Sequence, residues 1–335
     1  MSKLIRALKI GVPLLLAVYL MYKTFEDPAK RDELFEAIGR MDLIWLFLSI
    51  LCAWVSHLVR AQRWRYLLIP LGYDTRLWTR YHATMAGYLI NMVLPRVGEV
   101  SRAAITSKYE KIPFDKTFGS IAAERIVDLV ILGAITALTM FTQRAIIWEH
   151  VSTMLEQQDS GESNPYVFWI KVGVVLAVLI GLYLLGNSLR VKILGFLKGL
   201  LDGLLSIYHT PYKFRFIADS LLIWGLYLLM FFLPFHCMPE TALMGTGAIM
   251  AAFVFGSFSV VLTPGGTGTY HFAVGLALSL YGLDLGIGQA LGLAIWASQA
   301  FMLIVLGALS LLLVPRYNRN YEGHTAVPVQ KNKTS

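Results

Sequence analysis

Apolar runs of about 20 residues recur along this chain and constrain its fold more than any other feature of the sequence. They lie near residues 4–22, 43–58, 78–94, 118–141, 166–185, 216–237, 241–262 and 285–314, with a shorter run at 270–281. A helix of about 20 apolar residues spans the hydrocarbon core of a bilayer. Because 56% of the residues are hydrophobic, the sequence predicts an all-α polytopic membrane protein with a bundle of about eight transmembrane segments.

The net charge of +8 fits a membrane setting and does not indicate nucleic-acid binding. The cations lie in short stretches between apolar runs, where they orient segments and contact anionic headgroups. Basic stretches at 60–65, 96–116 and 190–215 predict the inside, and the acidic stretch 149–162 predicts the outside. The basic start of the chain is interpreted as a retained signal anchor. We therefore expect a multi-pass protein of the cytoplasmic (inner) membrane with its N-terminus inside.

No polar stretch is long enough to form a separate soluble domain. We expect one integral membrane domain over residues 1–315 and a disordered cytoplasmic tail over 316–335. A charged stretch at 27–40 has helical apolar spacing and predicts an interfacial amphipathic helix. Cys52 and Cys237 both lie in apolar runs, so they indicate neither a disulfide framework nor a zinc site.

The apolar run 78–94 stops at Pro95 and is followed at once by charged residues. Proline removes a backbone donor, and Gly98 permits a bend. Cations lie on both sides of this run, and both groups favour the cytoplasmic side. The run therefore does not cross the membrane once from one side to the other. We expect a re-entrant hairpin that turns near residues 91–98, with freed backbone groups facing protein or water. The alternative is an ordinary interfacial helix end with a basic flank.

Glu124, Arg125 and Asp128 interrupt the run 118–141. Glu124 and Asp128 are four residues apart, so they share one helix face. Each carboxylate costs roughly 2.5–3.5 kcal/mol at the centre of a membrane helix, which favours an inward orientation with partners. We expect these groups to face Arg96, Glu99 and Arg102 in a polar cavity. If the helix starts deeper in the loop, all three are interfacial instead.

Arg96 and Arg102 are the best candidates to bind an anionic group. A guanidinium presents a planar fork of donors that matches a phosphate with two parallel hydrogen bonds. Glu99 could orient one of these arginines or contact a cationic headgroup. The alternative is a purely structural Arg–Glu pair.

A second break follows the run 241–262, where Gly265, Gly266 and Gly268 precede a short apolar helix. Backbone N–H groups at such a helix start can hold a phosphate, although glycines in membranes more often form tight turns or close packing. His271 could titrate near neutral pH or serve as a structural histidine. Residues 265–281 either cross fully or form a second hairpin. If these residues form a hairpin, we expect one other segment to differ in the number of times it crosses the membrane.

Several enzyme signatures are missing from the sequence, including His-Glu-x-x-His, Gly-x-Ser-x-Gly and the P-loop. We therefore predict no catalytic residues, no cofactor, no metal site and no enzymatic activity.

The motifs occur in a fixed order along the chain. Their residues are Asn91, Pro95, Arg96, Gly98, Glu99 and Arg102, then Glu124, Arg125 and Asp128, then Pro264, Gly265, Gly266 and Gly268. This order resembles the lysylphosphatidylglycerol synthase transmembrane, or flippase-like, family, the membrane half of the multiple peptide resistance factor. Because the chain ends at Ser335, we expect a stand-alone member without the synthase domain. The sequence departs from the commoner form after the glycines, where Thr269, Tyr270 and His271 replace an acidic residue.

The resemblance implies a helical bundle with one or two re-entrant helices and a role in lipid translocation. The residues implied to line a headgroup path are Asn91, Arg96, Glu99, Arg102, Glu124, Arg125, Asp128, Gly265, Gly266, Gly268 and His271. We expect the protein to move an anionic lipid or lipid-linked carrier between leaflets, downhill or coupled to an ion. An intramembrane enzyme acting on a lipid headgroup and a non-transporting subunit of an envelope-assembly complex are the alternatives. A homo-oligomer is left open.

Overall fold

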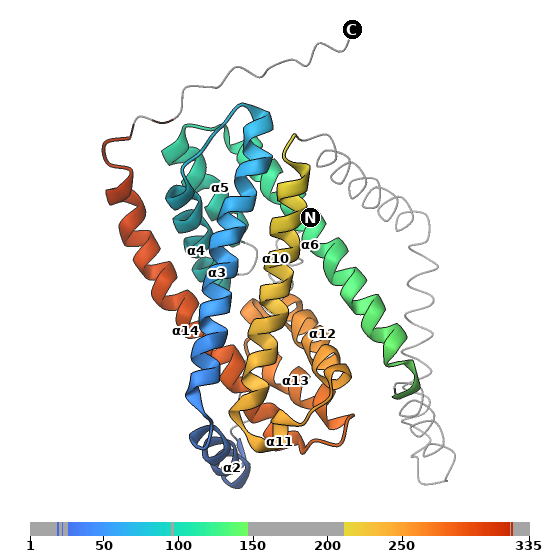
Figure 1. Cartoon of the computed structure of the whole chain (residues 1–335). Helices are drawn as coiled ribbons and strands as arrows, with labels where there is room; N and C mark the ends of the chain where they lie inside the picture. Colours follow the sequence, from blue (N-terminus) through green and yellow to red (C-terminus); the bar gives the residue numbers. More distant parts are fainter. Residues whose placement is uncertain are drawn as a thin grey trace, which may run out of the picture.

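The structure, a computed structural model, describes residues 26–94, 97–146 and 211–321, together with positions 19, 22 and 323. Within these ranges every regular element is a helix (Figure 1). The predicted all-α polytopic membrane fold is confirmed. The runs predicted at 4–22 and 166–185, and the loops at 149–162 and 190–210, lie outside the described residues, apart from positions 19 and 22.

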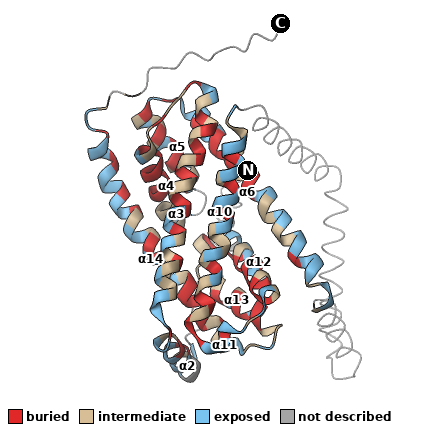
Figure 2. Cartoon of the chain, viewed as in Figure 1, coloured by how far each residue is buried: buried red, intermediate tan, exposed pale blue. Residues whose placement is uncertain are grey.

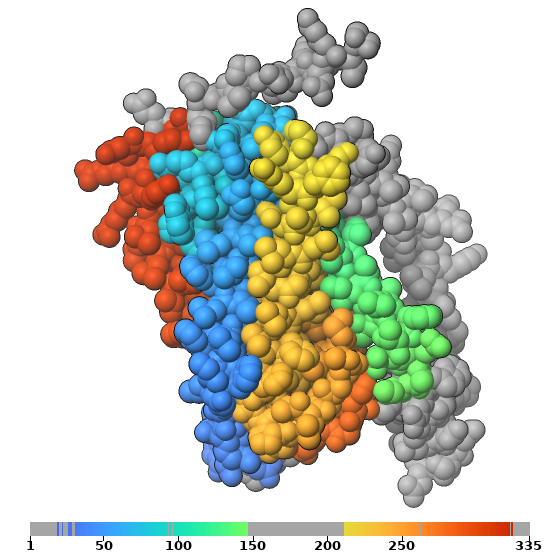
Figure 3. Space-filling view, in the orientation of Figure 1, coloured from blue at the N-terminus to red at the C-terminus, as the bar shows by residue number. Residues whose placement is uncertain are grey.

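Three described segments are long and apolar enough to span a membrane. They are α3 (Leu43–Leu68) with its short extension to Leu71, α10 (Lys213–Phe232) with η2 (Leu233–Cys237), and α14 (Leu285–Tyr317). The carboxylates of Asp42 and Asp284 accept from the backbone N–H groups of Ile44 and Ile287, which caps the start of α3 and of α14. Helices α3 and α10 lie side by side across one face of the molecule (Figure 3).

The first helical hairpin consists of α4 (Leu77–Val93) and α5 (Val97–Glu110). The backbone N–H of Arg76, just before α4, donates to Oε1 of Glu110 at 3.2 Å. The chain therefore enters and leaves this hairpin at the same end of the molecule, as the sequence predicts. A Cβ atom on Gly98 would overlap the carbonyl oxygen of Gly87, so glycine is what lets the two helices approach so closely.

The second helical hairpin consists of α12 (Thr246–Leu262), η3 (Pro264–Gly266) and α13 (Tyr270–Ser279). Its start and end both lie beside Gln143, which is adjacent to Gly247 and accepts from Tyr281 Oη at 3.1 Å. Helix α13 has 10 residues, about 15 Å, half of a hydrocarbon core of about 30 Å. It cannot cross a membrane fully.

This hairpin corrects one expectation about parity. Two full membrane crossings return the chain to the side from which it started, and one re-entrant hairpin does the same. The number of membrane crossings made by the other segments therefore does not have to change. The start of α14 lies on the same side in either case.

The two hairpins enter from opposite ends and their turns meet inside the molecule (Figure 1). A Cβ atom on Gly265 in η3 would lie 3.7 Å from Cγ of Met92 in the last turn of α4. Each hairpin lies between two long helices in sequence, since α3 and α6 (Phe114–Thr142) flank the first and α10 and α14 flank the second. This order is that of an inverted structural repeat.

Buried residues fill the space between the helices, while exposed residues cover much of their outward faces (Figure 2). The largest apolar core lies around α12, α13 and the first half of α14. Helix α2 (Pro28–Gly39) matches the predicted helix at 27–40, and it packs Leu34 and Ala37 into this core while Phe35 stays exposed.

The C-terminal boundary differs from the prediction. Helix α14 continues to Tyr317, and the guanidinium of Arg76 lies between the rings of Tyr317 and Tyr321, at 4.2 and 3.8 Å from their centroids. Arg76 also donates to the side chain of Asn318. The start of the predicted disordered tail at residue 316 is therefore too early. Residues after 321, apart from Gly323, lie outside the described part.

Candidate functional site

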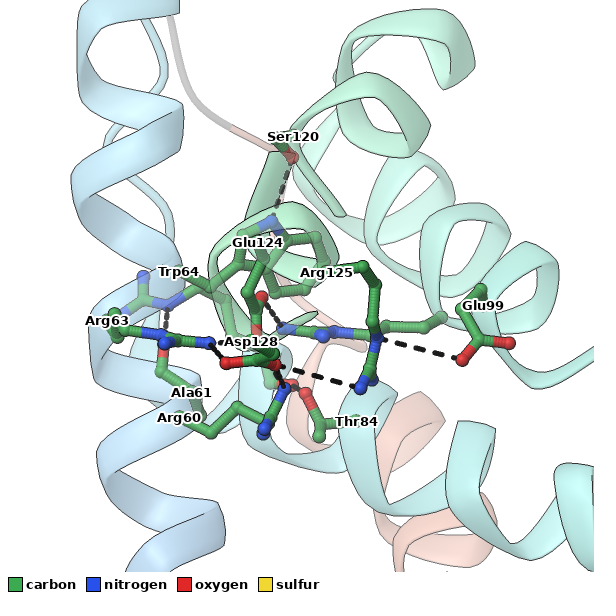
Figure 4. Close-up of polar contacts among 12 residues, drawn as sticks. Arg60, Ala61, Arg63, Trp64, Thr84, Glu99, Ser120, Glu124, Arg125 and Asp128 are labelled. Carbon is green, nitrogen blue, oxygen red and sulfur yellow. Dashed lines mark hydrogen bonds and ion pairs between the residues drawn. The ribbon is translucent and has the colours of Figure 1, made fainter. Parts of the chain in front are cut away.

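A cluster of charged side chains lies buried between α3, α5 and α6 (Figure 4). We call it the buried charge cluster, and its members are Arg60, Arg63, Arg102, Glu124 and Asp128. Each element contributes through helical spacing. Arg60 and Arg63 are three residues apart on α3, and Glu124 and Asp128 are four apart on α6, so each pair projects from one helix face.

Glu124 is the centre of this cluster. Its carboxylate accepts from Nη1 of Arg60 at 2.8 Å, Nη2 of Arg63 at 3.1 Å and Nη2 of Arg102 at 3.0 Å. The side chain is 0% exposed. The expected inward orientation of Glu124 with charged partners is therefore present, while its depth in the membrane remains a prediction. A carboxylate buried in this way persists only because three guanidinium groups compensate its charge.

Asp128 completes the pairing of the two arginines on α3. It accepts from Nη1 of Arg60 at 2.8 Å and from Nη2 of Arg63 at 2.9 Å. Helix α10 supplies the remaining polar partners, since Tyr227 Oη accepts from Nη2 of Arg60 at 3.0 Å and Ser220 Oγ from Nη1 of Arg63 at 3.0 Å. The cluster thus ties α3, α6 and α10 together.

Arg60 and Arg63 are functional candidates that the sequence reasoning missed. It assigned the basic stretch 60–65 to the cytoplasmic interface and ended the helix near residue 58. Helix α3 instead continues to Leu68, and the side chains of Arg60 and Arg63 are 2% and 0% exposed. The signal that could have found them is their spacing of three residues, which places both on one helix face, as the spacing of four does for the carboxylates on α6. Arg65 is partly exposed and pairs with Asp74.

A looser group of polar side chains borders the cluster on one side. We call it the rim, and it consists of Asn91, Glu99 and Arg125. Nε of Arg125 lies 3.8 Å from Oε1 of Glu99, and Nη1 lies 3.8 Å from Oδ2 of Asp128. The side chains of Arg125 and Glu99 are 34% and 28% exposed. Asn91 fixes Glu99 by donating to Oε2 at 3.2 Å, and it accepts from the N–H of Gly98 at 2.7 Å.

Arg102 connects the cluster to the rim. Its guanidinium lies 4.0 Å from the ring centroid of Trp64, whose Nε1 is anchored on Ser120 Oγ at 2.8 Å. One nitrogen pairs with Glu124, but Nε and Nη1 are buried and have no hydrogen-bond partner among the described residues. A donor left in this state costs about 1–3 kcal/mol. It therefore indicates a partner that is an ion, a ligand or a water.

A small cavity of about 10 Å³ lies between α4, α5 and α6, large enough for roughly one water. Its lining residues are Thr84, Gly87, Tyr88, Asn91, Gly98, Glu99, Arg102 and Arg125. The cluster and the rim together hold four arginines against three carboxylates, an excess of one positive charge. The arrangement therefore carries one positive charge that a bound anion could neutralise.

The predicted glycine residues lie at the turn of the second hairpin, not in the charge cluster. Gly265, Gly266 and Gly268 have φ values of 59°, 75° and 75°, which favour glycine. The backbone N–H groups of Gly266 and Thr267 donate within the turn. These features match the tight-turn interpretation. A phosphate-binding role for the three glycines remains a prediction.

Among the described residues, His271 also lies outside the cluster. His271 is 1% exposed and packs against Gly292 of α14, where a Cβ atom would lie 2.9 Å from the Cα of His271. This placement fits a structural histidine. Pro95 and Arg96 lie outside the described residues, so the prediction for Arg96 stays untested.

Comparison with known proteins places this architecture in a family. Residues 7–316 match the family model described as the lysylphosphatidylglycerol synthase TM region. The chain belongs to this family. The resemblance drawn from the ordered motifs is thereby confirmed, and the match covers both hairpins and the charge cluster. The family is named for the transmembrane part of the synthase.

Two curated proteins are similar to the chain. The UPF0104 membrane protein MJ1595 of Methanocaldococcus jannaschii is 21% identical over 321 residues, which cover 85% of this chain and 89% of that protein. The glycosyltransferase AglD of Haloferax volcanii is 26% identical over 131 residues, which cover 39% of this chain and 20% of that protein. No solved structure matches the chain.

Proposed function

We propose that this protein translocates an anionic lipid, or a lipid-linked carrier with an anionic headgroup, between the leaflets of the cytoplasmic membrane. The observation that carries the proposal is the buried charge cluster, which lies inside an apolar helical bundle next to the turn of a helical hairpin. A buried charge in a membrane protein is expensive and usually marks a substrate or ion path. An excess of positive charge selects an anionic headgroup.

The arrangement divides the work between two sets of side chains. Glu124 and Asp128 have five short contacts with arginines, so their role is to hold these arginines at membrane depth. Arg102 retains N–H donors that Glu124 does not use, and Arg125 contacts its carboxylates at only 3.8 Å, so both can donate to a headgroup phosphate. The acyl chains remain in the bilayer while the headgroup passes through the polar region.

The two hairpins support this proposal through their geometry. Their turns meet inside the bundle, as occurs where inverted repeats enclose a site near the bilayer midplane. The end of the molecule that carries Lys108, Lys111 and Lys116 is the more basic one, since the end with α2 carries Asp32, Glu33 and Glu36 alongside Arg31 and Arg40. By the distribution of cations, we assign the basic end to the cytoplasm.

Topology is tested by single cysteines in a background without Cys52 and Cys237. Positions 108 and 36 are both exposed and lie at opposite ends of the described structure. We expect an impermeant thiol reagent added to intact cells to label a cysteine at position 36 and not one at position 108. Labelling of position 108 alone would reverse the assignment.

Transport is tested with purified protein in liposomes that contain a fluorescent phosphatidylglycerol or, in parallel, a fluorescent phosphatidylcholine. We expect movement of the anionic lipid above the rate in empty liposomes, and little movement of the zwitterionic lipid. Arg102→Lys keeps the charge but cannot pair with Glu124 and also present the Nε–H and Nη1–H donors of the planar guanidinium, so transport should fall roughly tenfold. Arg316→Lys, at an exposed position near the end of α14, is the matched control. Wild-type protein that moves neither lipid would favour the enzyme or subunit alternatives.

The same measurement applies to Arg96→Lys. If Arg96 binds phosphate through its fork, lysine should weaken transport roughly tenfold, whereas a residue that only sets topology should tolerate lysine. Equal rates for wild type and Arg96→Lys would remove Arg96 from the headgroup site.

A further inference from the structure

The Glu99 carboxylate occupies an unusual place among the acids around the cavity. Glu124 and Asp128 contact arginines at 2.8–3.1 Å and have side chains no more than 10% exposed. Glu99 reaches Arg125 at only 3.8 Å and is 28% exposed. Partly exposed pairs at this distance contribute about 0–1 kcal/mol, so this contact is easily exchanged.

The position of Glu99 is nevertheless fixed. Asn91 donates to its Oε2 and accepts from the backbone N–H of Gly98, one residue earlier. One amide side chain thus holds both the α5 start and the carboxylate. The carboxylate lies beside the cavity that Arg102 and Arg125 also line. A weakly paired anion is therefore held in place at a site bordered by two cations.

Arg102 supplies the second, independent observation. Its side chain is 3% exposed, and its Nε and Nη1 atoms have no partner within the described part of the chain. The two-oxygen forks of a guanidinium are Nε with Nη2 and Nη1 with Nη2, and Glu124 occupies Nη2 of Arg102. The remaining Nε and Nη1 groups lie on different edges, so Arg102 can give an added oxyanion one charged N–H donor. Arg102 and Arg125 both line the same small cavity.

We infer that Arg102 and Arg125 form a binding site for a phosphate-type oxyanion, and that Glu99 is an internal substitute for this anion in the ligand-free protein. This inference deepens the proposed function by assigning the headgroup contact and its competitor. On binding, the phosphate accepts from one unpartnered N–H group of Arg102 and replaces Glu99 at Arg125.

The test measures binding of two probes to full-length protein in one detergent. One probe is a short-chain phosphatidylglycerol, and the other is inorganic phosphate. Glu99→Gln keeps the shape and the contact with Asn91 but removes the competing charge, so affinity should rise about fivefold. Asp115→Asn removes the same charge from an exposed position in the first turn of α6 and should leave affinity unchanged. Arg125→Lys should weaken binding about tenfold.

The two probes separate the sources of the anion. Tighter binding of both probes by Glu99→Gln indicates a site for phosphate itself, and tighter binding of the lipid alone indicates a site that also needs the acyl chains. Unchanged or weaker binding of both probes by Glu99→Gln, with an unchanged melting temperature, overturns the inference. If Glu99→Gln proves unstable, Arg125→Lys decides, since equal affinity to wild type for both probes also overturns it.

Failure of this inference is distinct from failure of the proposed function. If wild-type liposomes transport lipid while Glu99→Gln leaves binding unchanged, the internal-substitute role is wrong and transport stands. If binding changes as expected but the liposomes move no lipid, the oxyanion site stands and the transport proposal is wrong.

Discussion

The two helical hairpins have the same architecture and opposite chemistry. The α4–α5 hairpin presents Asn91, Glu99 and Arg102 to a polar cavity and adjoins the charged face of α6. The α12–α13 hairpin presents an apolar surface, and its turn is closed by its own backbone and by a hydroxyl pair between Thr263 and Thr269 at 2.7 Å. An inverted pair of hairpins therefore does not require two equivalent sites. In this protein one hairpin carries the charges and the other supplies a compact surface against which the first turn packs.

The substitution with the largest expected effect on stability is Glu124→Leu. Three arginines would lose their common acceptor, and breaking a buried pair typically costs 3–5 kcal/mol. We expect loss of the folded protein, measured as aggregation in size-exclusion chromatography and a much lower melting temperature. Glu124 lies on α6 and pairs with Arg102 of the first hairpin. The comparison variant is Thr269→Val in the second hairpin, which removes one hydroxyl pair and should cost about 1 kcal/mol. Equal effects of the two substitutions would contradict the division into a charged and an apolar hairpin.

Glu124→Leu also revises how a transport defect should be interpreted. Changing Glu124 and Asp128 together to leucine would be expected from the sequence alone to preserve insertion and abolish function. The structure indicates that the double change leaves Arg60 and Arg63 without their carboxylate partners. Lost transport would then reflect lost folding, so each variant needs its melting temperature measured alongside.

An intermediate effect is expected for Gly98→Ala. The added methyl group would overlap Gly87 and Asn91 at the closest point of the first hairpin, and such overpacking costs about 1–3 kcal/mol. Gly119→Ala on α6 has no atom within 4 Å of the new Cβ and should be neutral or slightly stabilising. The comparison uses thermal denaturation in one detergent. A wild-type melting temperature for Gly98→Ala would mean that the hairpin is packed less closely than described.

The smallest effect concerns the second turn. Nε1 of Trp296 donates to the carbonyl oxygen of Gly265 at 2.8 Å, and Trp296→Phe keeps the ring but removes this bond. We expect a loss of about 0.5–1.5 kcal/mol in stability. Phosphatidylglycerol binding should not change, because Trp296 contacts the turn of the apolar α12–α13 hairpin and not the buried charge cluster. A tenfold loss of binding would show that the second turn takes part in headgroup recognition.

Much of this fold could be predicted because the apolar composition of membrane helices identifies them in the sequence. The bounds of α4 follow within one residue from its apolar run, while α6 starts four residues before its predicted run and α12 starts five residues after the start of its run. The first hairpin followed from cations on both sides of one run. The second hairpin was left open. The distribution of charges fits both a hairpin and two full crossings, and only the length of α13 distinguishes them.

The candidate site was predicted in part. Glu99, Arg102, Glu124, Arg125 and Asp128 meet as expected, since unpaired acids in an apolar run require partners. Their pairing could not be derived, and Arg60 and Arg63 were assigned to the interface. A basic residue at the end of an apolar run has the same sequence appearance whether its helix stops or continues inward. Only the facing helix distinguishes the two.

The contacts of α14 have a consequence for how this protein is made. Gly307 packs against Leu89 of α4, His82 Nδ1 contacts Ser310 Oγ at 3.0 Å, and Arg76 is held by Asn318. These partners are between 218 and 242 residues apart in sequence. A ribosome that has delivered the first hairpin to the membrane must still synthesise nearly all the remaining chain before that hairpin acquires its last neighbour. The charge-bearing half of the molecule is inserted into the membrane early, but its packing is completed only when α14 has been made. A chain that stops before α14 would expose polar groups to lipid and become a substrate for quality-control proteases.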